Sequence, residues 1–176
     1  MIKKFLTIVL GLVIFNEICC AKDILQFDFP NEGWHKVKSP DGIESKKCFV
    51  PVNQTTENYT EMLIFYERII KHAGYSPMSL LQKQLGKDKN NYKDIVPEYI
   101  LTDEYNPMVT WCSKLRNTCA VERAIQGKEG IVIATYLNKA PHYSQNIFGQ
   151  WSNILALVKI YDKNSNVVPK NLIELD

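Results

Sequence analysis

Two cysteines in the middle of the chain have the spacing most suggestive of chemistry. Cys112 and Cys119 lie in the stretch TWCSKLRNTC, which begins at Thr110. A redox-active pair would more typically form a Cys-x-x-Cys motif at a helix start, and a structural zinc site would need four Cys or His ligands. Neither pattern is present in the sequence. The spacing therefore favours a structural disulfide, with free thiols as the alternative.

Other side chains that could do chemistry are dispersed along the sequence. The histidines do not stand at a metal-binding spacing: His35, His72 and His142. No Gly-x-Ser-x-Gly elbow supplies an activated serine. Four glutamates could form an acid/base pair only if the fold brought them together: Glu57, Glu61, Glu67 and Glu122. We expect no catalytic residue, no metal and no cofactor, and we keep a small secreted hydrolase with a spatially assembled acid/base pair as the alternative.

Basic residues gather around the turn motif SPDG, whose Pro, Asp and Gly each suit a turn position. Four lysines and a tryptophan there form a possible binding surface: Trp34, Lys36, Lys38, Lys46 and Lys47. A locally basic surface suits an acidic lipid headgroup or a protein partner. The ordinary alternatives are a solvated basic face and a tryptophan that packs in the core.

The first residues have the three-part organisation of a secretory signal peptide. Lys3 and Lys4 precede an apolar run over 5–15, and small residues precede Lys22. The apolar run is shorter than the roughly 20 residues that a transmembrane helix needs. We therefore expect cleavage of residues 1–21, no transmembrane anchor afterwards, and a periplasmic or extracellular location.

Export bears on the remaining cysteines and on the charge. Cys19 and Cys20 lie at the end of the leader, where lipid attachment is the alternative to cleavage. In an oxidising compartment Cys112 and Cys119 can pair, which leaves Cys48 as a buried free thiol beside apolar neighbours. Removal of the leader leaves a nearly neutral chain, which does not favour a nucleic-acid binder. We expect a monomer with a single domain over 22–162, and a C-terminal extension over 163–176 that is either docked or frayed.

Hydrophobic patterning predicts the elements that must position these residues. Alternating or branched apolar segments predict strands over 34–38, 44–50, 61–70, 97–102, 108–115, 118–126 and 130–137. For 61–70, a long apolar run, a helix is the alternative. Apolar residues at helical spacing predict helices over 77–93, with Ser76 as its N-cap, and over 144–161. Six residues between the two cysteines place them directly opposite each other across a hairpin, on one face.

This order of elements predicts an α+β fold with a largely antiparallel sheet of about six to seven strands. The two main helices lie outside the sheet, and the C-terminal one packs on it because its apolar stripe must be covered.

Several short motifs occur in an order that resembles a known group. They are Gly33-Trp34, FVPVNQTTENYTEMLIF over 49–65, Trp111 with the cysteine pair, and VERAIQGKEG over 121–130. Together they resemble a group of small, uncharacterised secreted proteins of Legionella-type and related bacteria, and the order of strands and helices is similar to the PsbP/Mog1-like α+β arrangement. The resemblance implies export from a bacterial cell and no particular catalysis. We therefore expect a secreted, non-enzymatic binding or interaction protein, such as an exported host-interaction factor.

Overall fold

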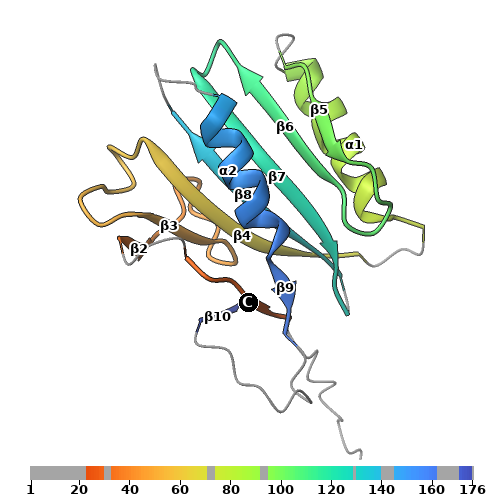
Figure 1. The fold of residues 1–176 in the computed structure, drawn as a ribbon, viewed down its shortest axis with the longest axis horizontal. Coiled ribbons are helices and arrows are strands. Elements are labelled where there is room, and N and C mark those ends of the chain that lie inside the picture. Colours follow the sequence, from red (N-terminus) through yellow and green to blue (C-terminus); the bar gives the residue numbers. More distant parts are fainter. Residues whose placement is uncertain are drawn as a thin grey trace, which may run out of the picture.

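The computed structural model describes residues 23–29, 33–70, 74–91, 95–128, 130–139, 145–161 and 171–175. They form an α+β fold with two helices, a seven-stranded sheet and a three-stranded sheet (Figure 1). All strand pairs are antiparallel, which confirms the predicted fold class. No helix in these ranges is both long and apolar enough to cross a membrane. The predicted signal peptide over 1–21 lies outside the described residues.

The large sheet carries the candidate sites. In spatial order its strands are β2 (Trp34–Val37), β3 (Lys47–Pro51), β4 (Glu61–Ile69), β8 (Gly130–Asn138), β7 (Thr118–Gln126), β6 (Met108–Ser113) and β5 (Glu98–Leu101). Strand β4 is central, as its branched and aromatic residues predict, and it pairs with β8 along its whole length. Strands β2 and β5 are the two edges of this sheet.

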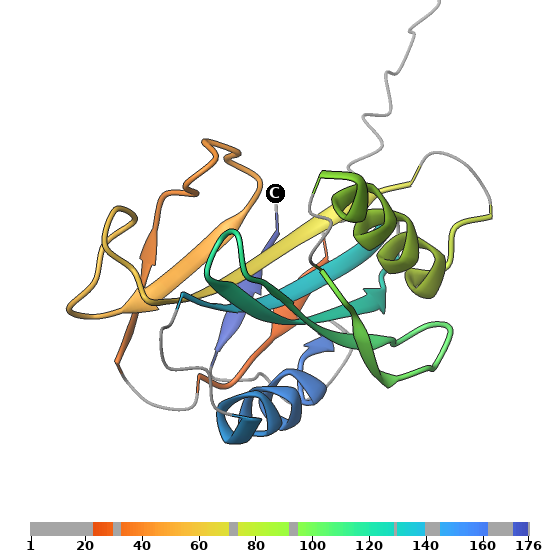
Figure 2. The same ribbon diagram turned by 90° about the horizontal axis from the view of Figure 1, so that it is seen from above.

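The two helices, α1 (Pro77–Asn91) and α2 (Gln145–Ala156), cover opposite faces of the sheet (Figure 2). Helix α1 begins as predicted, because the Ser76 hydroxyl accepts a hydrogen bond from the Ser79 N–H at 3.2 Å. On the α1 face, Leu81 packs with apolar side chains of β6, β7 and β8. On the α2 face, Trp151 and Leu155 pack in the larger core with Phe65 and Tyr136.

The prediction that the second helix extends to residue 161 is wrong. Helix α2 ends at Ala156, and Lys159–Ile160 forms strand β9. The last turn tightens, since the N–H groups of Leu157 and Val158 donate to carbonyls three residues earlier. The apolar pattern continued past the helix end because Val158 is fully buried in the same core.

Strand β9 belongs to a small sheet on the α2 side. Its central strand is β1 (Ile24–Gln26), and its other edge is β10 (Leu172–Glu174). Leu25 and Ile173 from this sheet are buried in the core beneath α2. The end of the chain around β10 is thus docked, which is one of the two alternatives that the sequence left open.

The connection between β2 and β3 contains two successive turns. The Gly42 N–H donates to the Ser39 carbonyl at 3.0 Å, which closes the predicted SPDG turn, and Gly42 has a φ of 73° that favours glycine. The Lys46 N–H then donates to the Ile43 carbonyl at 3.1 Å. Because of this second turn, β3 begins at Lys47 and not at residue 44 as predicted.

Candidate functional site

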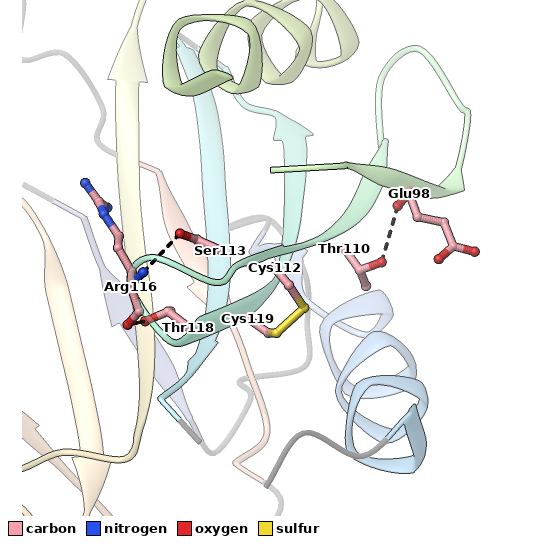
Figure 3. Close-up of a disulfide and its surroundings, with 7 residues drawn as sticks. All are labelled: Glu98, Thr110, Cys112, Ser113, Arg116, Thr118 and Cys119. Carbon is pink, nitrogen blue, oxygen red and sulfur yellow. Dashed lines mark hydrogen bonds between the residues drawn. A yellow bond between two sulfur atoms is a disulfide. The ribbon is translucent and has the colours of Figure 1, made fainter. Parts of the chain in front are cut away.

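The cysteine pair lies at the position that the hairpin register predicts. Cys112 on β6 is directly opposite Cys119 on β7, and their sulfur atoms form a disulfide of 2.07 Å. The Asn117 N–H donates to the Lys114 carbonyl at 3.2 Å in the turn between these strands. Figure 3 shows the disulfide on the side of the hairpin that is turned toward α2. It joins neighbouring strands of one sheet, which is the arrangement of a structural crosslink.

Replacing both cysteines with alanine should lower the free energy of unfolding by about 2 to 3 kcal/mol. The disulfide closes a short loop, and the loss of this constraint raises the entropy of the unfolded chain. Urea unfolding of Cys112→Ala/Cys119→Ala beside the oxidised wild type measures the difference. A reductant should destabilise the wild type by a similar amount and leave the variant unchanged; equal unfolding midpoints of oxidised and reduced wild type would contradict the prediction.

Cys48 is a buried free thiol, as its apolar neighbours predict. It is fully buried on β3 beside Val50 and Met62. Burial raises the pKa of the Cys48 thiol above its ordinary value, although Ser39 and Lys46 act in the opposite direction. The protonated form therefore predominates near neutral pH, and this thiol is a poor nucleophile.

The four glutamates considered for acid/base chemistry do not come together. Glu57 lies in the loop before β4, where the Thr55 hydroxyl donates to it at 2.6 Å. Glu61 and Glu67 lie toward opposite ends of β4, and Glu122 accepts a hydrogen bond from the Gln84 Nε2 at 3.1 Å on the α1 face. These four residues therefore supply no acid/base pair.

A metal site is likewise not assembled in the part of the chain that the structure describes. No group of three or more His, Cys, Asp or Glu side chains there has a geometry that could hold a metal ion. His35 lies on β2, whereas His72 and His142 lie outside the described residues.

The five residues of the predicted basic surface separate into two sets. Trp34 turns toward the α2 core, with its ring 5.6 Å from that of Trp151 in an edge-to-face arrangement. Lys47 is only 7% exposed. Both lie on the α2 side of the hairpin, since Trp34 and Lys47 alternate in phase with Phe49, which also packs there. Lys36, directly opposite Phe49, lies on the same side but is exposed on the edge strand. Neither Trp34 nor Lys47 offers a large exposed surface for a partner.

The other three lysines line one pocket, which we call the lysine pocket. Its volume is about 500 Å³, within the range of small-molecule sites. Its walls come from the end of β2 and the two turns that follow: Lys36, Val37, Lys38, Ser39, Gly42, Ile43, Glu44 and Lys46. The lining thus combines basic and apolar side chains.

The three lysines of the pocket differ in whether a carboxylate already contacts them. Lys46 forms a salt bridge with Asp41, whose carboxylate also accepts a hydrogen bond from Ser39. Slight burial raises the pKa of Asp41, but the bonds from Lys46 and Ser39 outweigh it and lower the pKa to about 2. Lys36 and Lys38 are exposed, and within the described ranges no carboxylate is recorded in salt-bridge contact with either. Their positive charges are the ones available to a ligand.

Sequence reasoning found the lysines of this pocket but not its apolar part. Val37 and Ile43 line it, and Ile43 is 45% exposed at the tip of the hairpin. A branched apolar residue directly after the SPDG turn was the available signal. The sequence alone did not show that Ile43 lines a pocket, because its position there depends on the second turn.

The architecture defines an α+β protein with a hollow on one hairpin of its antiparallel sheet. Comparison of the chain with protein-family models, with curated proteins and with solved structures finds no match. The resemblance to Legionella-type secreted proteins and the PsbP/Mog1-like likeness therefore stay predictions from the sequence.

Proposed function

We propose that this chain is an exported bacterial binding protein without catalytic activity, and that the lysine pocket takes an anionic amphiphile such as an acidic lipid. The observation that carries the proposal is the lining of this pocket, in which Lys36, Lys38 and Lys46 occur together with the apolar side chains of Val37 and Ile43. Such a lining matches a ligand that has an anionic head and an apolar chain.

The head of the ligand would lie between the lysines. Lys36 and Lys38 can donate to carboxylate or phosphate oxygens, whereas Lys46 is held by Asp41 and contributes mainly to the shape of the wall. Glu44 is the acidic residue in this lining and limits how many charges a ligand can carry. The pocket is therefore better suited to a singly charged head than to a polyanion.

The apolar chain of the ligand has a path along the hairpin. Val37 lines the pocket and also packs against the core cluster of Cys48, Val50 and Met62, and Ile43 lines the pocket and is exposed to solvent. An exposed branched side chain beside lysines also suits the boundary between lipid headgroups and acyl chains. This arrangement supports binding to a lipid, whether the lipid is free or part of a membrane surface.

Neutralising the two available lysines should weaken binding by about 30-fold. Each lysine near an anionic surface contributes about 1 kcal/mol, so Lys36→Gln/Lys38→Gln should lose about 2 kcal/mol. Co-sedimentation with vesicles of phosphatidylglycerol and phosphatidylcholine measures the membrane arm. A titration with dissolved dihexanoyl phosphatidylglycerol measures binding of the free lipid.

The matched control for this experiment removes two lysines elsewhere. Lys114 lies in the β6–β7 turn and Lys128 in the β7–β8 turn, and both are exposed. Lys114→Gln/Lys128→Gln changes the net charge equally and should retain binding. Equal losses in both double variants, or equal binding to vesicles of phosphatidylcholine alone, would refute a specific lysine pocket.

A further inference from the structure

A second hollow lies on the α2 face of the sheet, at the edge opposite the lysine pocket. We call it the edge cleft; its volume is about 610 Å³. One wall is α2, with Phe148, Gly149, Ser152 and Asn153, and the other is the β5–β6 pair. The disulfide cysteine Cys112 and Thr110 lie along the β6 part of the cleft.

The outer wall of the edge cleft has a simple periodicity. Val96, Glu98 and Ile100 are two residues apart and all line the cleft. Such a spacing places side chains on one face of a regular strand. All three side chains line the cleft although the register of β5 against β6 shifts between Tyr99 and Leu101. Val96 is 80% exposed and Ile100 is 44% exposed, so apolar surface is open to solvent on both sides of one carboxylate.

Strand β5 is also the last strand of the sheet. It pairs with β6 on one side, and among the described residues no further strand of the large sheet pairs with its other side. An edge strand presents backbone N–H and C=O groups that can accept another extended chain. The exposed apolar side chains and the open edge thus occur together on the same short segment.

The charge of the edge cleft indicates which chain would fit. Glu98 is the charged residue in the lining, and in the described parts of the chain no cation is recorded in salt-bridge contact with its carboxylate. Figure 3 shows the Glu98 carboxylate directed away from β6. A cationic side chain on the incoming strand would complement it.

We propose that the edge cleft binds an extended segment of a protein partner by strand addition to β5. The segment carries a basic residue flanked, two positions away on each side, by apolar residues. Its backbone pairs with β5, the basic side chain meets Glu98, and the apolar side chains contact Val96 and Ile100 and enter the space beside α2.

A second copy of the chain is a poorer occupant. Antiparallel pairing of two β5 strands through their cleft-facing residues would bring two copies of Glu98 into the same ladder without a cation. Like charges near each other across strands are unfavourable. The partner that the charge pattern favours is thus a different, basic segment.

Helix α2 offers a variant that closes the cleft without removing a contact. Gly149 lines the cleft, and a Cβ atom added there would meet nothing within 4 Å. Gly149→Trp should therefore fill the space with a bulky side chain, whereas Gly149→Ala should leave most of it open. Both variants should fold, because the added atoms extend into an open hollow.

The test uses two labelled peptides whose central residue differs in charge: Ser-Val-Thr-Arg-Thr-Val-Ser and the same peptide with Glu in place of Arg. Fluorescence anisotropy with the purified protein should show at least threefold tighter binding of the Arg peptide. Glu98→Lys should reverse this preference, and Gly149→Trp should weaken binding of both peptides at least tenfold. Gly149→Ala and the control Glu104→Lys, at an exposed position outside the lining, should bind like the wild type.

Three outcomes would overturn the proposal. The first is the absence of binding by the wild type up to millimolar protein, and the second is equal affinity for both peptides. The third is binding that Gly149→Trp leaves unchanged, which would place the peptide elsewhere on the surface. Hydrogen exchange adds a backbone readout, since strand addition should slow exchange of amides in Glu98–Leu101.

Discussion

Replacing Trp151 with alanine is expected to lower the free energy of unfolding by about 3 to 5 kcal/mol. The Trp151 ring stacks on that of Tyr136 with centroids 4.1 Å apart and planes at 12°, and it is only 7% exposed. It also contacts Trp34 edge-to-face. Its removal would leave a large cavity between α2 and the sheet, because close-packed neighbours relax only partly. Urea unfolding followed by circular dichroism measures the loss.

The control for this prediction lies just beyond the same helix. Leu157 is 69% exposed, so Leu157→Ala should change the free energy of unfolding by less than about 0.5 kcal/mol. A loss of under 1 kcal/mol in Trp151→Ala would show that α2 does not cover the sheet through this ring.

The second large effect is expected from Arg123→Met, with a loss of about 3 kcal/mol. The two N–H groups on the Arg123 Nη1 atom are shared among three carbonyls at the end of α2: Leu155 at 2.7 Å, Ala156 at 2.8 Å and Val158 at 2.8 Å. Hydrogen bonds from a charged donor contribute about 1.5 to 3 kcal/mol, and a cation also suits the C-terminus of a helix. Solvation of the exposed Ala156 carbonyl recovers part of the loss.

Arg123→Lys should fall between the wild type and Arg123→Met, because it keeps the charge but not the reach of the guanidinium group. The exposed Arg68→Met is the control and should have little effect. Thermal unfolding of the wild type and the three variants gives the order of their stabilities directly. If Arg123→Met unfolds at the wild-type midpoint, the three bonds do not stabilise the end of α2.

The elements that the sequence predicted are those with strong local signals. Ser76 followed by Pro77 is a local sequence signal for the start of α1. The spacing of Cys112 and Cys119 predicts the register of the hairpin in which they pair. The branched and aromatic residues of β4 favoured a central strand over the helix that was the alternative, because such side chains pack well on the faces of a sheet.

The elements that the sequence did not reveal depend on distant residues. Strand β1 has three residues, and it is defined by pairing with β9 and β10 from the far end of the chain. The carbonyls at the end of α2 accept hydrogen bonds from Arg123, which lies more than thirty residues earlier. Neither relation leaves a periodic pattern in the local sequence.

In the candidate sites, too, the sequence revealed the features with a local signal and not those that depend on distant residues. The lysines around the SPDG turn were visible as a basic cluster, but their spacing could not show that Lys47 is buried while Lys36 and Lys38 stay exposed. Lys36 and Lys47 lie on the same face of the hairpin, but Lys47 is on β3, which is flanked by strands on both sides, whereas Lys36 is on the edge strand β2. The edge cleft had no signal of its own, since its walls come from residues about fifty positions apart.

The most direct measurement of the central claim is a titration of the ¹⁵N-labelled protein with dihexanoyl phosphatidylglycerol below its micelle concentration, followed by amide chemical shifts. The largest shifts should fall on residues of the lysine pocket, above all Lys36, Lys38 and Ile43. Dihexanoyl phosphatidylcholine should produce much smaller shifts at the same residues. Shifts that are largest at the edge cleft, or equal for the two lipids, would contradict the proposal that this pocket binds an anionic amphiphile.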